Sequence, residues 1–432
     1  MEPVVRSVYP DAQQWRQLEA AVFGGAGVAL QRVRDYARAN HLSPVAFLET
    51  AALYALACTP GNVTLDAGLG PFSPNMFLCL IGAPGAGKDR LMRATRNAIT
   101  VSSGGKILTP KDAGIGSGEG MLKALEPTEE EPVAPPVLFG VSEVGLLRQL
   151  AGRQGSTLRP HMLNVYSGNT LTTNNKADKT YVPADSYRAC MWVGAQPDTV
   201  GYLLEGDDDG LRHRFIFTEV VDPARTLGGD YPSTMPLKVD VPAGLLRGEP
   251  MQFAPAIVES VRNAQERKLI YGAAPGDNGH RMQTTLKLAA GIALLASADR
   301  VTEEDYARAK ALMDYSSDVI AGAEAHLFGK RVEADAERLE RRDAAEEQRE
   351  ASKVAKARRE VLEAVQGDAE WIAESPLRNR ARRYRDQFDT AVQALEVAGA
   401  VEVATVEEGQ RVRRWLRAGP RLQAVLSAEG LS

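Results

Sequence analysis

A glycine-rich segment, Gly82-Ala83-Pro84-Gly85-Ala86-Gly87-Lys88, has the residue types and spacing of a phosphate-binding loop. Its three glycines allow the backbone N–H groups to approach phosphate oxygens closely. Lys88 would neutralise the charge of the β- and γ-phosphates. An apolar run of strand length, 76–81, precedes the segment, and helical periodicity follows over 90–99. This order of strand, glycine loop and helix predicts a nucleotide-phosphate site, with ATP as its ligand.

The metal side of the predicted site departs from the usual pattern. A Ser or Thr normally follows the lysine and binds Mg²⁺ through its hydroxyl, but Asp89 stands there. The strand 135–141 resembles the second signature of P-loop ATPases, an apolar strand ending in Asp-Glu, but it ends in Ser142-Glu143. Hydroxyl and carboxylate are thus exchanged between two positions that face each other in P-loop folds. We expect Asp89 and Ser142 to bind Mg²⁺ and Glu143 to polarise the attacking water; the alternative is a site that no longer hydrolyses ATP.

Two further polar positions border predicted strands. Gln196 ends the buried strand 187–195, and in the additional-strand ATPases that this pattern resembles, such a residue lies beside the γ-phosphate. A plain loop glutamine is the other interpretation. Arg214 directly precedes the strand 215–217 and suits an arginine finger that reaches the γ-phosphate of a neighbouring subunit. Arg212 is the second choice for the finger, and an ordinary ion pair is the alternative interpretation.

Composition places these motifs in a globular protein. The chain has 432 residues, 44% of them hydrophobic and 25% charged, with a formal net charge of −5. Two or three domains are expected at this length, and nucleic-acid contact would need local basic patches. Cys58, Cys79 and Cys190 stand far apart in apolar stretches, which favours free thiols in a reducing compartment. With no apolar signal core at residues 1–6 and no run long enough for a membrane helix, we expect a cytoplasmic protein without membrane contact.

Patterning along the chain predicts an α/β fold in five parts. These are an N-terminal helical region (1–62), a P-loop-type α/β core (63–225), a connecting segment and helical lid (226–327), a charged helical linker (328–358) and a terminal domain (359–432). Ser43-Pro44 marks one helix start, and Thr302, ahead of three acidic residues, marks another. The linker lacks apolar heptad positions, which favours a solvated spacer, helical or flexible, over a coiled coil.

The terminal domain has the pattern of a winged helix. Helices are expected over 361–365, 376–383 and 385–397. A β-hairpin should follow, with strands near 401–403 and 412–416. Three helices and a hairpin form a winged helix, which binds either DNA or a partner protein.

In this order, the features resemble an AAA+ ATPase, closest in layout to minichromosome-maintenance-type helicases. The matching phrases are the glycine loop, Ser142-Glu143, Gly194-Ala195-Gln196-Pro197, Arg214-Phe215 and Val301-Thr302-Glu303-Glu304-Asp305. Other phrases, such as Gly116-Ser117-Gly118-Glu119-Gly120, look like uncharacterised, primase-linked ATPases of phages and mobile elements. The resemblance implies ATP and Mg²⁺ as cofactors, a nucleotide-binding lid arginine, here Arg281, and a homo-oligomeric ring, a hexamer, with a primase as candidate partner.

Two basic regions are candidate nucleic-acid contacts. The segment 170–182 predicts a β-hairpin with Lys176 and Lys179 near its tip, where ring helicases place a hairpin facing the pore; a plain surface hairpin is the alternative. In the terminal domain, arginines cluster, although the chain as a whole has a negative net charge. Those expected to contact DNA are Arg380, Arg382, Arg383, Arg413 and Arg414.

Three functions are compatible with these features. The first is an oligomeric DNA motor that hydrolyses ATP, a replicative DNA helicase of a phage or mobile element. The second is a nucleotide-gated DNA-binding switch, a helicase loader or initiator that does not unwind. The third is a scaffold that binds nucleotide without turnover. Stimulation of ATP hydrolysis by single-stranded DNA favours the motor, and hydrolysis with duplex-only binding favours the switch.

Overall fold

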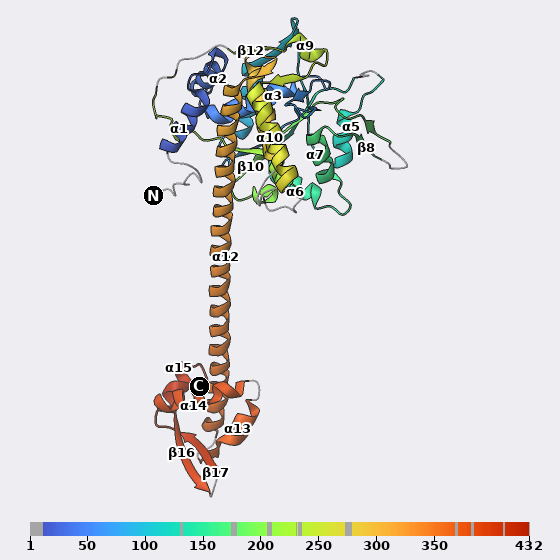
Figure 1. Ribbon diagram of the computed structural model, residues 1–432. Helices are drawn as coiled ribbons and strands as arrows, with labels where there is room; N and C mark the ends of the chain where they lie inside the picture. Colours follow the sequence, from blue (N-terminus) through green and yellow to red (C-terminus); the bar gives the residue numbers. More distant parts are fainter. Residues whose placement is uncertain are drawn as a thin grey trace. The chain divides into compact units, whose positions relative to one another are not determined.

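The computed structural model describes residues 12–129, 133–173, 179–204, 210–229, 231, 236–272, 279–367, 370–381, 384–408 and 411–431 (Figure 1). The chain divides into two compact units, Met1–Gly329 and Lys330–Ser432. The first is a mixed α/β unit built on parallel strands, as the sequence predicts. Among the described helices, none combines the length and apolarity that crossing a bilayer requires.

Five parallel strands form the central sheet of the first unit, in the order β11-β3-β10-β7-β6. Their bounds are β3 (Phe77–Ile81), β6 (Lys111–Ala113), β7 (Val137–Val141), β10 (Ala189–Ala195) and β11 (Phe215–Glu219). The runs of β3 and β10 are buried throughout, as expected when helices cover both faces of a parallel sheet. Because all five strands run the same way, their carboxyl ends meet at one edge and their amino ends at the opposite edge.

Helix α3 (Pro44–Ala57) is buried at every residue. A helix without a polar face must be enclosed on all sides, and α3 packs against β3, β10 and the helices α4 (Lys88–Ala98) and α11 (Gly279–Leu295). Its start at Ser43-Pro44 is confirmed: the Ser43 hydroxyl accepts a hydrogen bond from the Ala46 N–H, with Pro44 in the first turn.

Further elements surround this centre (Figure 1). The helices are α1 (Ala12–Phe23), α2 (Val28–Ala39), α5 (Gly118–Leu125), α6 (Val144–Ala151), α7 (Leu158–Ser167), α8 (Gly201–Leu204), the 3-10 turn η1 (Arg212–Arg214), α9 (Ala243–Leu246) and α10 (Pro255–Tyr271). One smaller sheet has the order β14-β13-β1-β2, from Arg300–Val301, Met251–Phe253, Leu65–Asp66 and Pro71–Phe72. Another has the order β12-β4-β5, from Leu237–Asp240, Ile99–Ser103 and Lys106–Ile107.

Helix α12 (Glu303–Gln366) is a single helix of 64 residues. Its predicted start is confirmed: the Thr302 hydroxyl accepts the Asp305 N–H, while the Asp305 carboxylate accepts the Thr302 N–H. The charged stretch expected as a linker belongs to this helix and is exposed along 328–349. Same-face ion pairs such as Arg341 with Glu337 occur along it. The prediction of a separate short helix over 361–365 is therefore wrong, because those residues end α12.

The second unit has its own core, formed by the end of α12, three helices and an antiparallel sheet of order β15-β17-β16. The elements are β15 (Ile372–Ala373), α13 (Glu374–Arg380), α14 (Arg385–Val397), β16 (Val401–Glu408), β17 (Arg411–Ala418) and α15 (Leu422–Ala428). Of the expected elements, the helix over 385–397 and the hairpin are present, and α13 overlaps the expected helix over 376–383 as far as Arg380. Strand β15 and helix α15 were not anticipated, because both are too short to show a strand or helix periodicity.

Candidate functional site

The glycine loop, residues 82–87, joins β3 to α4 at the carboxyl edge of the central sheet. Gly85 and Gly87 have φ values of 77° and 95°, a backbone region that favours glycine. A Cβ at Gly82 would lie 2.6 Å from the Val220 Cγ2 atom, so a side chain there would collide with its neighbour. The Gly82 N–H donates to the Ala195 carbonyl at 3.1 Å, which ties the loop to the end of β10. The predicted strand, glycine loop and helix are all present.

Lys88 is the first residue of α4 and is only 7% exposed. Its ammonium Nζ donates to the Gly82 carbonyl at 2.9 Å and to the Ala83 carbonyl at 3.5 Å. A buried cation needs such partners, because burial removes its hydration. The lysine therefore lies folded against the loop whose ligand it is predicted to neutralise.

Gly194, near the end of β10, has no side chain, and this allows Ser142, which follows β7, and the Lys88 side chain to lie close to its backbone. A Cβ at this position would lie 2.2 Å from the Ser142 carbonyl oxygen and 3.3 Å from the Lys88 Cε atom. No role for this glycine was predicted from the sequence. A glycine inside an otherwise bulky buried strand is a signal of close backbone approach, and that signal could have identified it.

Glu143 and Gln196 meet at the same edge. Glu143 is exposed and lies just after β7, separated from the strand only by Ser142. The Gln196 side-chain amide, just after β10, donates to the Glu143 carboxylate, with 3.3 Å between Nε2 and Oε1. Neighbouring parallel strands end side by side, which is why residues 53 positions apart come into contact. Lys88, Ser142, Glu143 and Gln196 thus belong to one group at the carboxyl edge.

Asp89 and Ser142, the expected metal ligands, are both exposed at this edge. Within the described ranges, their side chains make no hydrogen bond or ion pair, and no group of three or more His, Cys, Asp or Glu residues is placed to hold a metal. Mg²⁺ bound with a nucleotide takes one or two protein oxygens, with phosphates and water completing the shell. The carboxylate and hydroxyl available here fit that requirement.

Arg214 lies at the opposite edge of the sheet. It directly precedes β11, whose first residue pairs in register with Phe77, the first residue of β3. A strand of five residues spans about 16 Å, and this length separates Arg214 from the glycine loop of its own chain. The Arg214 side chain is 9% exposed, donates to the Gly210 carbonyl at 2.9 Å and stacks on the Tyr166 ring at 5.7 Å.

Arg212 and Arg281 share a cavity of about 300 Å³ beside the amino end of β11, together with His213 and Phe215. The Arg212 side chain is 36% exposed and pairs with Glu324 at 3.2 Å. Arg281 pairs with Asp314 at 2.6 Å and also donates to Ser317. Arg281 was expected to contact nucleotide, and the structure places it at the edge opposite Lys88. The sequence does not show how far Arg281 lies from the glycine loop in the folded chain.

The expected hairpin before β10 is present, because β8 (Leu171–Thr172) pairs antiparallel with β9 (Tyr181–Val182). Lys179 is exposed beside it, and Lys176 lies outside the described residues.

In the second unit, Arg380 and Arg413 are exposed, whereas Arg382 and Arg383 lie outside the described residues. Arg414 pairs with Glu374 at 3.1 Å and with Asp389 at 3.3 Å. Side chains alternate along β17, so Arg414 shares the face of the buried Leu416, and Arg413 projects from the other face. Neighbouring arginines are also neutralised, Arg378 by Asp389 and Arg417 by Glu402, both at 2.5 Å. The sequence showed the arginine cluster but not the carboxylates that face it.

The amino edge also holds a buried polar network that no local sequence pattern predicts. Arg188 is fully buried and donates to the Asn75 side chain at 2.8 Å and to the Thr59 hydroxyl at 3.0 Å. Burial lowers the pKa of its guanidinium to about 10. Lys287, also fully buried, donates to the Asn75 and Tyr166 carbonyls at 2.8 and 2.6 Å, and burial lowers its pKa. These cations fix the strand and helix ends beneath Arg214.

No protein-family model matches the chain, and no curated protein matches it. The fold itself brings two groups of functional side chains together. At the carboxyl edge these are a buried lysine in a glycine loop and a carboxylate held by an amide. At the amino edge they are arginines around a small cavity.

Proposed function

We propose that the chain is an ATP-hydrolysing enzyme of the P-loop AAA+ type, with residues 82–88 as its phosphate-binding loop. The observation that carries this proposal is the buried ammonium of Lys88 inside the glycine loop, at the sheet edge where Glu143 meets Gln196. The order of strands supports it. Strand β10 lies between β3, which leads to the glycine loop, and β7, which precedes Ser142 and Glu143. In this position β10 would be the additional strand that this class of ATPase requires.

In this proposal, Lys88 exchanges the Gly82 and Ala83 carbonyls for oxygens of the β- and γ-phosphates. Backbone N–H groups of the loop and of the first turn of α4 surround the phosphates. Glu143 accepts the proton of a water that attacks the γ-phosphorus, and ADP leaves as the bond to the β-phosphate oxygen breaks. The Gln196 amide holds the Glu143 carboxylate in place through its hydrogen bond.

Asp89 and Ser142 are the groups that would hold Mg²⁺. Bound there, the ion would neutralise charge on the phosphate oxygens. The exchange of carboxylate and hydroxyl keeps one neutral and one anionic oxygen donor on the two elements. A second carboxylate, added at position 142, would instead place two like charges near one ion, which disfavours their joint ionisation.

Arg212, Arg214 and Arg281 lie at the amino edge, so a nucleotide in a glycine loop that they contact belongs to another copy of the chain. This argues for an oligomer in which one subunit completes its neighbour's site, as the proposed ring of six requires. The exposure of Arg212 supports it as the finger ahead of Arg214, the first choice from sequence, because Arg214 is enclosed by Gly210 and Tyr166. An arginine at that point stabilises negative charge as the phosphoryl group is transferred.

We further propose that this ATPase drives a DNA motor, a replicative helicase of a phage or mobile element. The hairpin with Lys179 and a winged helix in the second unit, with exposed Arg380 and Arg413, would supply the DNA contacts. Helices α10, α11 and the start of α12 would form the lid. A primase is the candidate partner.

ATP hydrolysis, measured with and without single-stranded DNA, tests this function, with a forked duplex to measure strand separation. The motor predicts stimulated hydrolysis and ATP-dependent unwinding. Hydrolysis with duplex binding but no unwinding would replace it by the nucleotide-gated loader or initiator. Nucleotide binding without any turnover would leave only the scaffold.

A further inference from the structure

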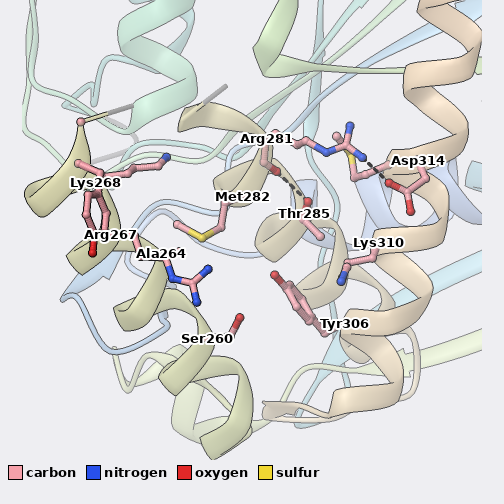
Figure 2. Close-up of a pocket in the computed structure, with 13 residues that line it drawn as sticks. Ser260, Ala264, Arg267, Lys268, Arg281, Met282, Thr285, Tyr306, Lys310 and Asp314 are labelled. Carbon is pink, nitrogen blue, oxygen red and sulfur yellow. Dashed lines mark hydrogen bonds and ion pairs between the residues drawn. The ribbon is translucent and has the colours of Figure 1, made fainter. Parts of the chain in front are cut away.

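A second, larger cavity lies between helices α10, α11 and the start of α12, all within the first unit (Figure 2). Its volume is about 660 Å³, which is in the range of sites for small organic ligands. Neither Lys88 nor Glu143 lines it, so it is separate from the carboxyl-edge site. Figure 2 shows side chains from all three helices arranged around the same space.

The cavity is strongly cationic. Arg267 and Lys268 come from α10, Arg281 from α11 and Lys310 from α12, against one carboxylate, Asp314. Asp314 pairs with Arg281, so it neutralises only that wall. Arg267 and Lys310 are exposed, and within the described part of the chain neither makes a hydrogen bond or an ion pair. Two cations facing one cavity without a carboxylate partner attract an anion, and phosphate is the anion that both side chains recognise well.

The lining of the cavity also has an apolar part. Ala264 of α10, together with Met282 and Met313, contributes hydrocarbon and thioether surface. The Tyr306 ring lies on the wall formed by α12, one helical turn before Lys310. An aromatic ring and flexible methionines accept the flat face of a base, because stacking needs no particular base edge. A lining that combines apolar side chains with cations matches a ligand with a planar apolar part and an attached phosphate.

We propose that this cavity binds a nucleotide unit, with its base against Met282 and Tyr306 and its phosphate on Arg267 and Lys310. The unit is either a free nucleotide or one residue of a single-stranded nucleic acid, since both present the same chemistry. The site acts in addition to the glycine loop and does not depend on it.

The test uses the full chain and two probes, fluorescent ADP and a fluorescein-labelled single-stranded thymidine oligonucleotide. The variant Arg267→Glu/Lys310→Glu reverses both partnerless cations at exposed positions. Its matched control, Lys106→Glu/Lys238→Glu, makes the same change of charge at exposed lysines on β5 and β12 that do not line the cavity. Losing both phosphate contacts should weaken the binding of at least one probe by about tenfold or more, because each charge-assisted contact is replaced by repulsion between a carboxylate and the phosphate.

A selective loss of ADP, with the number bound per chain falling by one, identifies a free nucleotide as the ligand. A selective loss of the oligonucleotide identifies a single strand. The conservative Arg267→Lys/Lys310→Arg variant keeps both charges and should retain binding, which separates the effect from misfolding. Equal binding of both probes by the reversal variant and its matched control overturns the proposal. If Lys88→Ala leaves ADP binding unchanged, the glycine loop is not the phosphate site, but the proposal for this cavity is unaffected. Adding Arg267→Glu/Lys310→Glu to Lys88→Ala should still weaken binding.

Discussion

The Gln196 amide donates a hydrogen bond to the Glu143 carboxylate, with 3.3 Å between Nε2 and Oε1. This contact joins the ends of two neighbouring parallel strands and leaves the carboxylate exposed toward the glycine-loop edge. A group that accepts a proton from water needs both a fixed position and access to solvent. The pair satisfies both conditions.

We therefore expect Glu143→Gln to bind ATP as the wild type does but to hydrolyse it at least about a hundredfold more slowly, since the proton acceptor is lost while the phosphate loop stays. Gln196→Ala should lower kcat by a smaller factor and leave KM nearly unchanged, because it removes only the group that positions the carboxylate. Single-turnover hydrolysis and equilibrium ATP binding measure the two effects. Hydrolysis near the wild-type rate in Glu143→Gln would remove this residue from the mechanism.

Gly194 offers a steric test of the same edge. In Gly194→Ala, the new methyl would lie 2.2 Å from the Ser142 carbonyl, so β7 and β10 must separate. We expect a loss of roughly 1–3 kcal/mol in the free energy of unfolding together with weaker ATP binding. Gly145→Ala is the matched control, since a Cβ there meets nothing within 4 Å. Thermal melting and ATP titration of the two variants measure these effects. Equal melting temperatures and equal ATP affinities in both variants would show that the carboxyl edge tolerates the displacement.

The exchanged oxygen donors at positions 89 and 142 predict energetic coupling. Asp89→Ser removes a carboxylate beside the ion, and Ser142→Asp adds one. The double change restores the usual hydroxyl and carboxylate positions, so its activity should exceed the product of the two single effects. A double-mutant cycle on ATP turnover across a Mg²⁺ titration measures this coupling. Strictly multiplicative effects on turnover would mean that the two residues do not share an ion.

The arginines of the amino edge predict complementation between subunits. Arg212→Ala should lower turnover in the assembled protein without weakening ATP binding, and Arg214→Ala should instead lower thermal stability, because Arg214 is packed on Tyr166. Mixing Arg212→Ala with Lys88→Ala should recover part of the activity, since mixed interfaces can pair an intact loop with an intact arginine. If co-assembled mixtures recover nothing at any ratio, the arginine does not act on a neighbour's nucleotide.

The order of strand, glycine loop and helix, the positions of Glu143 and Gln196 after buried strands, and the start of α3 could be predicted because each follows from a local pattern. A glycine loop after an apolar strand is readable within a dozen residues, and so is a Ser-Pro helix start. The convergence at Gly194, the pairing of Arg414 with Glu374 and Asp389, and the position of Arg281 all depend on long-range packing. Periodicity does not encode which residues face each other across a sheet or a core.

Turnover of ATP by Lys88→Ala tests the central claim most directly, measured as phosphate release from the purified full chain at saturating ATP and Mg²⁺. Lys106→Ala, which removes an exposed lysine from β5, is the matched control. We predict that Lys88→Ala releases no phosphate above background and binds ATP more weakly, whereas Lys106→Ala equals the wild type, because only Lys88 lies inside the glycine loop. Phosphate release by Lys88→Ala at the wild-type rate would contradict the assignment of residues 82–88 as the phosphate site.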